Sequence, residues 1–367
     1  MVEHGNGPLA GVRVVEMAGL GPAPFAAMVL ADMGADVVTV GRPGPTLQGP
    51  PSMNRGKRSL VLDVRTPEGR QTLLELAAKA DIFIEAYRPG VVERLGIGPE
   101  DCWALNPRLV YGRMTGWGQQ GPRAQEAGHD IGYVGLTGAL HAIGPRNGPP
   151  VPPLALVGDL GGGGMFLVTG VLAALHEAKT SGLGQVVDAA IVDGAATLMT
   201  PFYGMMELGA WVDERESNML DGGQPWYRVY RTADDRWLAV GAIEPQFWSE
   251  LLVKLEIPES ETSREDPSTW PELGERLATV IGSRTRDEWE KVFAGSDACA
   301  APVRSMSEAP HDPHLAARET FVEVGGCLQP APAPRFSRTP SPVPQPASAP
   351  GSDTDDVLRD WGLGTPA

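Results

Sequence analysis

The sequence is poor in cysteine and contains no long apolar run. Its three cysteines, Cys102, Cys299 and Cys327, are scattered and form no Cys-x-x-Cys pair, so neither a disulfide framework nor a structural zinc site is expected. The absence of any run of about 18 apolar residues argues against a membrane span. Residues 1–8 are acidic and polar and lack the pattern of a secretory signal. We therefore expect a soluble, cytoplasmic protein with reduced thiols.

Positive charge is also scarce. The 367 residues include 30 Lys and Arg against 46 Asp and Glu, a net charge of −16, so broad binding of nucleic acid or of an anionic membrane is not expected. An anionic ligand would need a local basic cluster. One is present at Arg55, Lys57 and Arg58, joined by Arg42, Arg88 and Arg94. From spacing alone, a polyphosphate site and ordinary surface charge remain equally open.

Strand-like and helix-like patterns alternate through the first half of the chain. The apolar or β-branched runs 12–17, 36–40, 60–64, 82–84 and 186–190 predict strands, and residues 22–33, 66–77, 161–180 and 192–208 predict helices. Thr66, Pro67 and Glu68 have the order of a helix start, with a capping hydroxyl, a first-turn proline and an acid. The alternation predicts a mostly parallel sheet covered by helices on both faces.

The second half predicts a smaller domain and a tail. Runs 226–230 and 237–241 flank a turn sequence at 232–235 and predict a hairpin, while 247–255, 270–281 and 286–293 predict helices. Residues 329–350 are dense in proline and serine and are expected to be extended. A chain of this length favours two domains.

Two glycine-rich segments match nucleotide-binding motifs only in part. Gly19 and Gly21 follow the first strand, but a third glycine is missing, Pro22 occupies the helix start, and Arg42 stands where an acid would bind a ribose. A tight strand-to-helix turn is therefore a better interpretation than a nicotinamide site. The glycines at 161–164 lack the Lys-Ser or Lys-Thr pair of a P-loop, and indicate close packing or N–H groups that stabilise an oxyanion.

His129 and Asp159 are the candidate catalytic groups. His129 lies in Gly128-His129-Asp130, between glycine-rich segments. A lone histidine is more often structural than catalytic, and Asp159 is placed to cap a helix that opens at Gly161. Taken singly, these residues leave the structural and catalytic interpretations open.

Longer segments decide between these interpretations. The chain resembles CoA-transferase family III at Val14-Val15-Glu16-Met17-Ala18-Gly19, Asn54-Arg55-Gly56-Lys57-Arg58-Ser59 and Arg88-Pro89-Gly90-Val91. Within that family it is similar to the α-methylacyl-CoA racemases at Thr115-Gly116-Trp117-Gly118-Gln119, Gly128-His129-Asp130-Ile131, Asn218-Met219-Leu220-Asp221-Gly222-Gly223, Val240-Gly241-Ala242-Ile243-Glu244-Pro245-Gln246-Phe247 and Asp297-Ala298-Cys299. The resemblance covers nearly the whole chain.

The resemblance implies an α/β protein with the family III CoA-transferase fold. It implies a large Rossmann-like domain at 1–189, a linker helix at 190–226 and a small α+β domain at 227–310. A return linker at 311–333 and a C-terminal segment at 334–367 would rejoin the large domain. Two chains would interlock as a homodimer, in which the small domain supplies Glu244 to hydrogen-bond His129 of the other subunit.

The implied reaction is racemisation of 2-methylacyl-CoA thioesters. His129 and Asp159 would be an acid/base pair on opposite faces of the α-carbon, exchanging its proton through an enolate. No metal, nicotinamide or flavin is expected, and coenzyme A would be part of the substrate. The resemblance carries CoA contacts to Arg42, Leu62, Asp63, Val64, Arg65, Ala86, Tyr87, Arg88, Arg94, Gly128, Asp130, Ile131, Gly132 and Tyr133, and it favours ligand binding for the basic cluster.

Two positions depart from the racemase pattern. This chain has Gly132 and Ala155 where the racemases commonly have asparagine. A roomier acyl pocket would explain both, and so would a different enolate reaction on the same scaffold. The main alternative is a CoA-transferase in which Asp159 attacks the donor thioester as a nucleophile. A non-catalytic acyl-CoA-binding protein is the third. The acyl group itself remains open.

Overall fold

The chain forms two compact units. This computed structural model describes residues 6–44 and 49–363, so residues 1–5 of the N-terminal segment discussed above lie outside it. The large unit comprises Met1–Ala139, Pro153–Met199 and Arg318–Ala367, and the small unit comprises Leu140–Pro152 and Thr200–Ala317.

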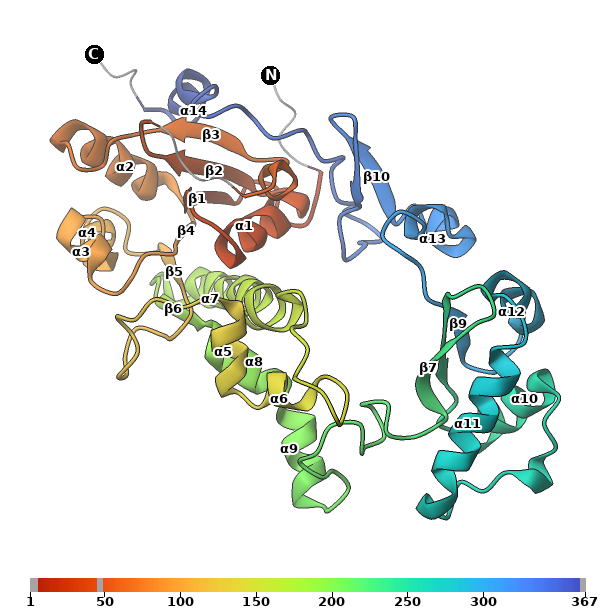
Figure 1. Cartoon of the computed structure of the whole chain (residues 1–367). Helices are drawn as coiled ribbons and strands as arrows, with labels where there is room; N and C mark the ends of the chain where they lie inside the picture. The colour runs from red at the N-terminus through yellow and green to blue at the C-terminus, as the bar shows by residue number, and fades with distance from the viewer. Residues whose placement is uncertain (1–5, 45–48, 364–367) are drawn as a thin grey trace. The chain divides into compact units, whose positions relative to one another are not determined.

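The large unit is built on a six-stranded parallel sheet (Figure 1). Its strand order is β3 (Arg58–Val61), β2 (Asp36–Gly41), β1 (Arg13–Met17), β4 (Ile82–Glu85), β5 (Val110–Thr115) and β6 (Val186–Ala190). The runs at 12–17, 36–40, 82–84 and 186–190 are confirmed as strands. The expected strand 60–64 begins earlier, at Arg58, because the main-chain pairing with β2 starts there. Sequence reasoning missed β5.

Helices cover both faces of this sheet, as expected (Figure 1). One face packs against α1 (Pro22–Asp32) and α7 (Phe166–Ser181). The other packs against α2 (Pro67–Lys79), α4 (Pro99–Trp103) and α14 (Thr354–Asp360). The predicted start of α2 is confirmed, because Oγ1 of Thr66 accepts the N–H of Gly69 at 3.1 Å. Shorter helices in this unit are α3 (Val91–Leu95), α5 (Asp130–Leu136), α8 (Ile191–Leu198) and the 3-10 turn η1 (Pro51–Asn54).

The apolar segment predicted as one helix over 161–180 begins earlier than expected. A π-helix, η2 (Leu156–Met165), precedes α7, so Asp159 lies inside a helical turn and the prediction that it caps a helix at Gly161 is wrong. The glycines of this segment allow close packing: a Cβ on Gly162 would lie 2.5 Å from the backbone nitrogen of Ala195. The continuous stretch Leu156–Ser181 is long and apolar enough to span a membrane by length and composition. Here, its Leu167 and Val171 are buried against the sheet.

The small unit contains an antiparallel sheet and three longer helices. Its strands are β7 (Tyr227–Arg231), β8 (Trp237–Gly241) and β9 (Ala300–Pro302), and the first two form the predicted hairpin. The predicted helices are α10 (Pro245–Leu255), α11 (Trp270–Ile281) and α12 (Arg286–Phe293). The helix expected over 192–208 is interrupted: α8 ends at Leu198 and α9 (Thr200–Glu207) follows, because Pro201 cannot continue a helix. Short helices are α6 (Ala139–Ala142) and α13 (Pro313–Ala317), with 3-10 turns η3 (Glu259–Glu261), η4 (Pro267–Thr269) and η5 (Ala309–His311).

The C-terminal segment returns to the large unit. After the hairpin of β10 (Phe321–Val324) and β11 (Cys327–Pro330), the chain forms no helix or strand until α14. The backbone N–H of Ser59 donates to Asp353 at 2.7 Å, and the indole of Trp361 donates to Asp36 at 2.8 Å. The proline-rich tail is therefore tied to the edge of the sheet at β2 and β3.

Candidate active site

A cavity of about 640 Å³ lies in the large unit at the carboxyl ends of β1, β2 and β3. The strand order reverses between β1 and β4, and open α/β sheets bind ligands beside such a reversal, at the carboxyl ends of their strands. Four of the residues predicted to contact CoA line this cavity: Arg42, Leu62, Val64 and Tyr87. Their neighbours Asp63 and Arg65 instead form an exposed ion pair with each other, at 2.8 Å.

The basic cluster divides into two groups. Arg55 pairs with Asp32 at 2.6 Å, Lys57 with Glu16 at 2.8 Å, and Arg58 with Asp36 at 2.6 Å. Each of these three side chains is therefore already paired with a carboxylate of the same unit, and Lys57 and Arg58 also line the cavity. Arg42, Arg88 and Arg94 are exposed and form no ion pair within residues 6–44 and 49–363. Within this cluster, they are the members without an ion-pair partner among the described residues.

His129 is placed at the N-terminus of α5. It is the N-cap residue in an extended conformation, and its carbonyl accepts the N–H groups of Gly132 and Tyr133. The side chain makes no cap hydrogen bond and is exposed, so the imidazole is accessible. The neighbouring Ile131 and Gly132 are exposed too, whereas Gly128 is half-buried.

Asp159 is held close to this helix start. Its backbone N–H donates to Oδ1 of Asp130 at 2.8 Å, which ties η2 to the first turn of α5. Gly158 permits the approach, since a Cβ there would lie 2.1 Å from the same oxygen. Burial, and after it the charge of Asp130, raises the pKa of the Asp159 carboxyl to about 6, and His129 acts in the opposite direction. His129 is therefore close enough to Asp159 to affect the pKa of its carboxyl.

Two tyrosines have pKa values that respond to the exposed arginines, and one of them, Tyr133, also responds to Asp159. The ring of Tyr133 fits against Gly116 and Gly128, where a Cβ would lie 2.0 Å and 2.5 Å from it, and meets Trp117 edge-on. Burial raises the pKa of Tyr133, Asp159 raises it too, and Arg88 opposes them. Burial likewise raises the pKa of Tyr87, as does Glu85, while Arg42 opposes the shift. Arg88 therefore lies within electrostatic range of Tyr133, and Arg42 within range of Tyr87.

The turn after β1 completes the surroundings of Asp159. Gly21, the N-cap of α1, has a φ of 71°, which favours glycine, and a Cβ there would lie 3.3 Å from Oδ2 of Asp159. The interpretation of Gly19 to Pro22 as a tight strand-to-helix turn is confirmed, and the turn brings the end of β1 next to the carboxylate.

The two departures from the racemase pattern differ in surroundings. A Cβ at Gly132 would meet no atom within 4 Å, so that position faces open space. Ala155 is the N-cap of η2 and has a φ of 61°, a left-handed conformation that asparagine tolerates better than alanine. Replacing asparagine by alanine at position 155 therefore places a less suitable residue in a left-handed backbone conformation.

Sequence reasoning missed Glu85. Its side chain is buried, and it accepts the backbone N–H of Tyr87 at 2.7 Å. Burial raises the pKa of its carboxyl to about 7, against the effects of that hydrogen bond and of Arg113. An acid directly after the apolar run Ile82-Phe83-Ile84 was the available signal. By accepting the N–H of Tyr87, Glu85 fixes the backbone of the segment that also contains Ala86 and Arg88, both of which are exposed.

Glu244 belongs to the small unit. It is the exposed N-cap of α10 and makes no side-chain cap hydrogen bond. Arg264 donates to the carbonyls of Ala242 and Ile243 and stacks on Trp226 at 4.3 Å, which fixes the backbone before Glu244. Within the described residues of both units, no group of three or more His, Cys, Asp or Glu side chains is placed to hold a metal ion.

The chain is similar to known proteins over almost its whole length. The profile of CoA-transferase family III matches residues 9–354. The chain is 45% identical to α-methylacyl-CoA racemase of Mus musculus, over 97% of this chain and 93% of that protein. It is 42% identical to the racemase of Homo sapiens, over 97% and 94%. A solved structure of a CAIB/BAIF family protein from Brucella suis, 25% identical, superposes with a TM-score of 0.83 over 97% of this chain and all of that one. The chain belongs to CoA-transferase family III.

Proposed function

We propose that the chain is an isomerase that racemises 2-methylacyl-CoA thioesters. The observation that carries the proposal is the Asp159 carboxyl, whose pKa is raised to about 6 beside His129 at the carboxyl edge of the sheet. A carboxyl with such a pKa is present in both protonation states near neutral pH, as a group that both removes and returns protons requires. The two racemases at 42–45% identity support the same reaction.

The proposed chemistry is a proton exchange at one carbon. For one enantiomer, His129 removes the α-proton, the C–H electron pair forms the enolate, and Asp159 returns a proton to the opposite face. For the other enantiomer the roles are reversed. The thioester α-proton is weakly acidic, so the enolate oxygen needs hydrogen-bond donors. The glycines of η2 around Asp159 can bring backbone N–H groups to it.

Coenzyme A is proposed as part of the substrate, with no further cofactor. Leu62, Val64 and Tyr87 would line the nucleotide or pantetheine part, and the exposed Arg42, Arg88 and Arg94 would bind its phosphates. Because Asp63 and Arg65 pair with each other, we propose only a minor contribution from them to phosphate binding.

An interlocked homodimer is proposed as the assembly, with Glu244 of one subunit reaching His129 of the other. Exposed apolar side chains beside the candidate pair support a partner there: Ile131 is 52% exposed, Leu136 60% and Leu156 60%. The same residues also suit an acyl chain. A cytoplasmic location is proposed because Cys102, Cys299 and Cys327 are free thiols.

The test is deuterium exchange of a single enantiomer of a 2-methylacyl-CoA ester in deuterium oxide, followed together with optical rotation. We expect both exchange and racemisation in the wild type. His129→Ala and Asp159→Asn should each slow racemisation by about 100-fold or more, the usual contribution of a general acid or base. His176→Ala, at an exposed position on α7, is the control. Undiminished exchange of both enantiomers in either variant would overturn the assignment.

A CoA-transferase reaction is the second candidate, and the family's own description favours it. Asp159 would then attack a donor thioester and form first a mixed anhydride and then an enzyme-bound CoA thioester. Mass spectrometry after mixing with an acyl-CoA decides between the two. An adduct on Asp159 supports the transferase, whereas exchange without an adduct supports the racemase.

A further inference from the structure

The inner wall of the cavity contains a buried carboxylate with unequal oxygens. Glu16, in β1, lines the cavity and has a side chain that is 0% exposed. Its Oε2 accepts two hydrogen bonds, from Nζ of Lys57 at 2.8 Å and from Oγ1 of Thr39 at 2.8 Å. Its Oε1 has no hydrogen-bond partner in the part of the chain that the structure describes.

An unpartnered buried oxygen of this kind is costly, so native proteins rarely leave one without a partner. Lys57 cannot supply the partner or serve a ligand. Its three N–H bonds are directed at Glu16, at the carbonyl of Pro24 (2.9 Å) and at Oδ1 of Asn54 (3.4 Å). The unpartnered atom of the Glu16–Lys57 pair is therefore an acceptor, which matches a ligand group that donates.

The phosphates of a CoA ester are poor partners for Oε1 of Glu16. A phosphate is an acceptor with negative charge, and beside Oε1 of Glu16 it would be repelled. The N–H donors of such an ester are of two kinds, the amino group of adenine and the amides of the pantetheine arm. Met17, Val40 and Leu62 also line the cavity and offer the apolar surface that either kind of group requires.

We propose that Oε1 of Glu16 accepts a hydrogen bond from an N–H group of the bound CoA ester and thereby determines which part of the ester enters the cavity. The proposal rests on the proposed function, since it takes a CoA ester as the ligand. Glu16 is thus a binding residue, held by Lys57 and Thr39 with one oxygen presented to the ligand.

Glu16→Gln tests the proposal because it reverses the polarity at one atom. Lys57 and Thr39 both donate, so the glutamine oxygen will face them and its NH₂ group will face the ligand donor. We expect free coenzyme A, titrated calorimetrically, to bind this variant about 10-fold more weakly or worse. Asp32→Asn is the matched control. It makes the same change in a buried ion pair, with Arg55, that does not line the cavity.

Two further ligands identify the donor. If adenine donates, adenosine 3′,5′-bisphosphate should lose the same affinity for the variant, and a hypoxanthine analogue of coenzyme A should bind the wild type about 10-fold more weakly. If a pantetheine amide donates, neither of these two losses of affinity should occur, and the variant should bind only coenzyme A more weakly. Both results support the proposal. Equal affinity of the wild type and Glu16→Gln for coenzyme A overturns it.

Folding failure of Glu16→Gln would not prevent the test. The double variant Glu16→Leu and Lys57→Met removes both charges together and leaves no unpaired ion, and it should show the same loss of coenzyme A affinity. If the wild type itself binds no coenzyme A, the proposed function fails, and that result is distinct from failure of the Glu16 proposal.

Discussion

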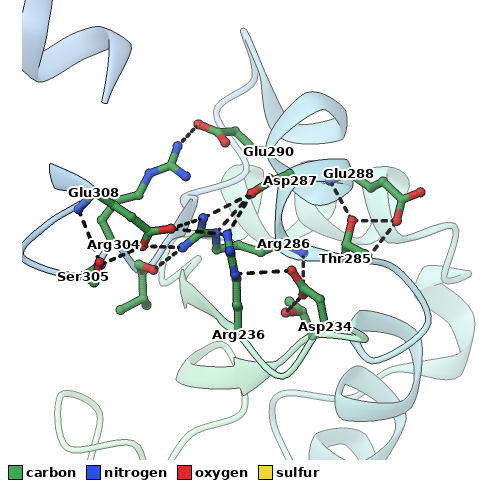
Figure 2. A network of polar contacts seen from close by, with 12 residues as sticks. Asp234, Arg236, Thr285, Arg286, Asp287, Glu288, Glu290, Arg304, Ser305 and Glu308 are labelled. Carbon is green, nitrogen blue, oxygen red and sulfur yellow. Dashed lines mark hydrogen bonds and ion pairs between the residues drawn. The ribbon is translucent and has the colours of Figure 1, made fainter. Parts of the chain in front are cut away.

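Two ion pairs, one from each unit, differ in how fully their carboxylates are hydrogen-bonded. In the large unit, Glu16 and Lys57 are nearly inaccessible to water and leave one carboxylate oxygen without a partner beside a cavity. In the small unit, Arg286 holds both oxygens of Glu308, and Arg236 and Ser305 also donate to that carboxylate (Figure 2). Glu308 is one-third exposed. A carboxylate such as Glu308, with both oxygens hydrogen-bonded by the protein, favours a structural role. A buried carboxylate oxygen without a partner, such as Oε1 of Glu16, favours a ligand-binding role.

Removing Lys57 should have the largest effect. Lys57→Ala leaves the Glu16 carboxylate buried without its cation, and we expect the free energy of unfolding to fall by about 3–5 kcal/mol. Urea denaturation measures this change. Arg65→Ala breaks an exposed pair and should leave the midpoint unchanged. If Lys57→Ala changed the free energy of unfolding as little as Arg65→Ala does, the Glu16 carboxylate would not depend on its cation. The difference drawn between this pair and the Glu308 cluster would then be wrong.

Glu308 provides the pH test of the small unit. Its hydrogen bonds to Arg286 lower the pKa of the carboxyl below the usual 4.5. A lowered folded pKa means that the stabilisation is present above about pH 4.5 and is lost as the pH falls through the folded value. Glu308→Gln should therefore be less stable than the wild type at pH 7, and the difference should narrow at pH 3.

Tryptophan fluorescence during thermal unfolding follows this difference, because Trp226, Trp248 and Trp289 form part of the small unit's core. Glu256→Gln is the control, since Glu256 pairs with Arg284 at 3.0 Å but is 76% exposed. A gap between Glu308→Gln and the wild type that stays constant from pH 7 to pH 3 would contradict the assigned role of Glu308.

Asp130 extends the comparison to the candidate acid/base pair. The pKa of Asp159 is raised to about 6, mainly by burial and secondly by the charge of Asp130. Asp130→Asn removes the charge but keeps an oxygen that can accept the Asp159 N–H. For the enantiomer deprotonated by Asp159, exchange should fall below about pH 6 in the wild type, and this acid limb should move to lower pH in the variant. Asp193→Asn, at an exposed position on α8, should leave the limb in place.

The smallest effect is expected at Ala155. Alanine is strained at its φ of 61°, and asparagine tolerates this conformation better, so Ala155→Asn should stabilise the fold by about 0.5 kcal/mol. Ala155→Val, with a branched β-carbon, should destabilise it. Denaturant midpoints distinguish the two. If asparagine instead changes the exchange rate strongly while stability is constant, the position acts on the reaction and not on the backbone.

Local patterns in the sequence were sufficient for most elements. Alternating β-branched runs predicted β1, β2, β4 and β6, and the Thr66 cap predicted the start of α2. These features depend on near neighbours in the chain, so a single sequence contains them. The start of η2 was missed because it depends on packing around glycines. The break before α9 was missed although Pro201 is a local signal for it.

The sequence by itself determined the family and named His129 and Asp159, since long motifs in a fixed order are specific. Only the tertiary structure decided what the charges do. Arg55, Lys57 and Arg58 looked equivalent to Arg42 along the chain, yet folding pairs the first three with carboxylates and leaves Arg42 exposed. The physical reason is that burial and partner distance set the energy of a charge, and both arise from residues distant in sequence.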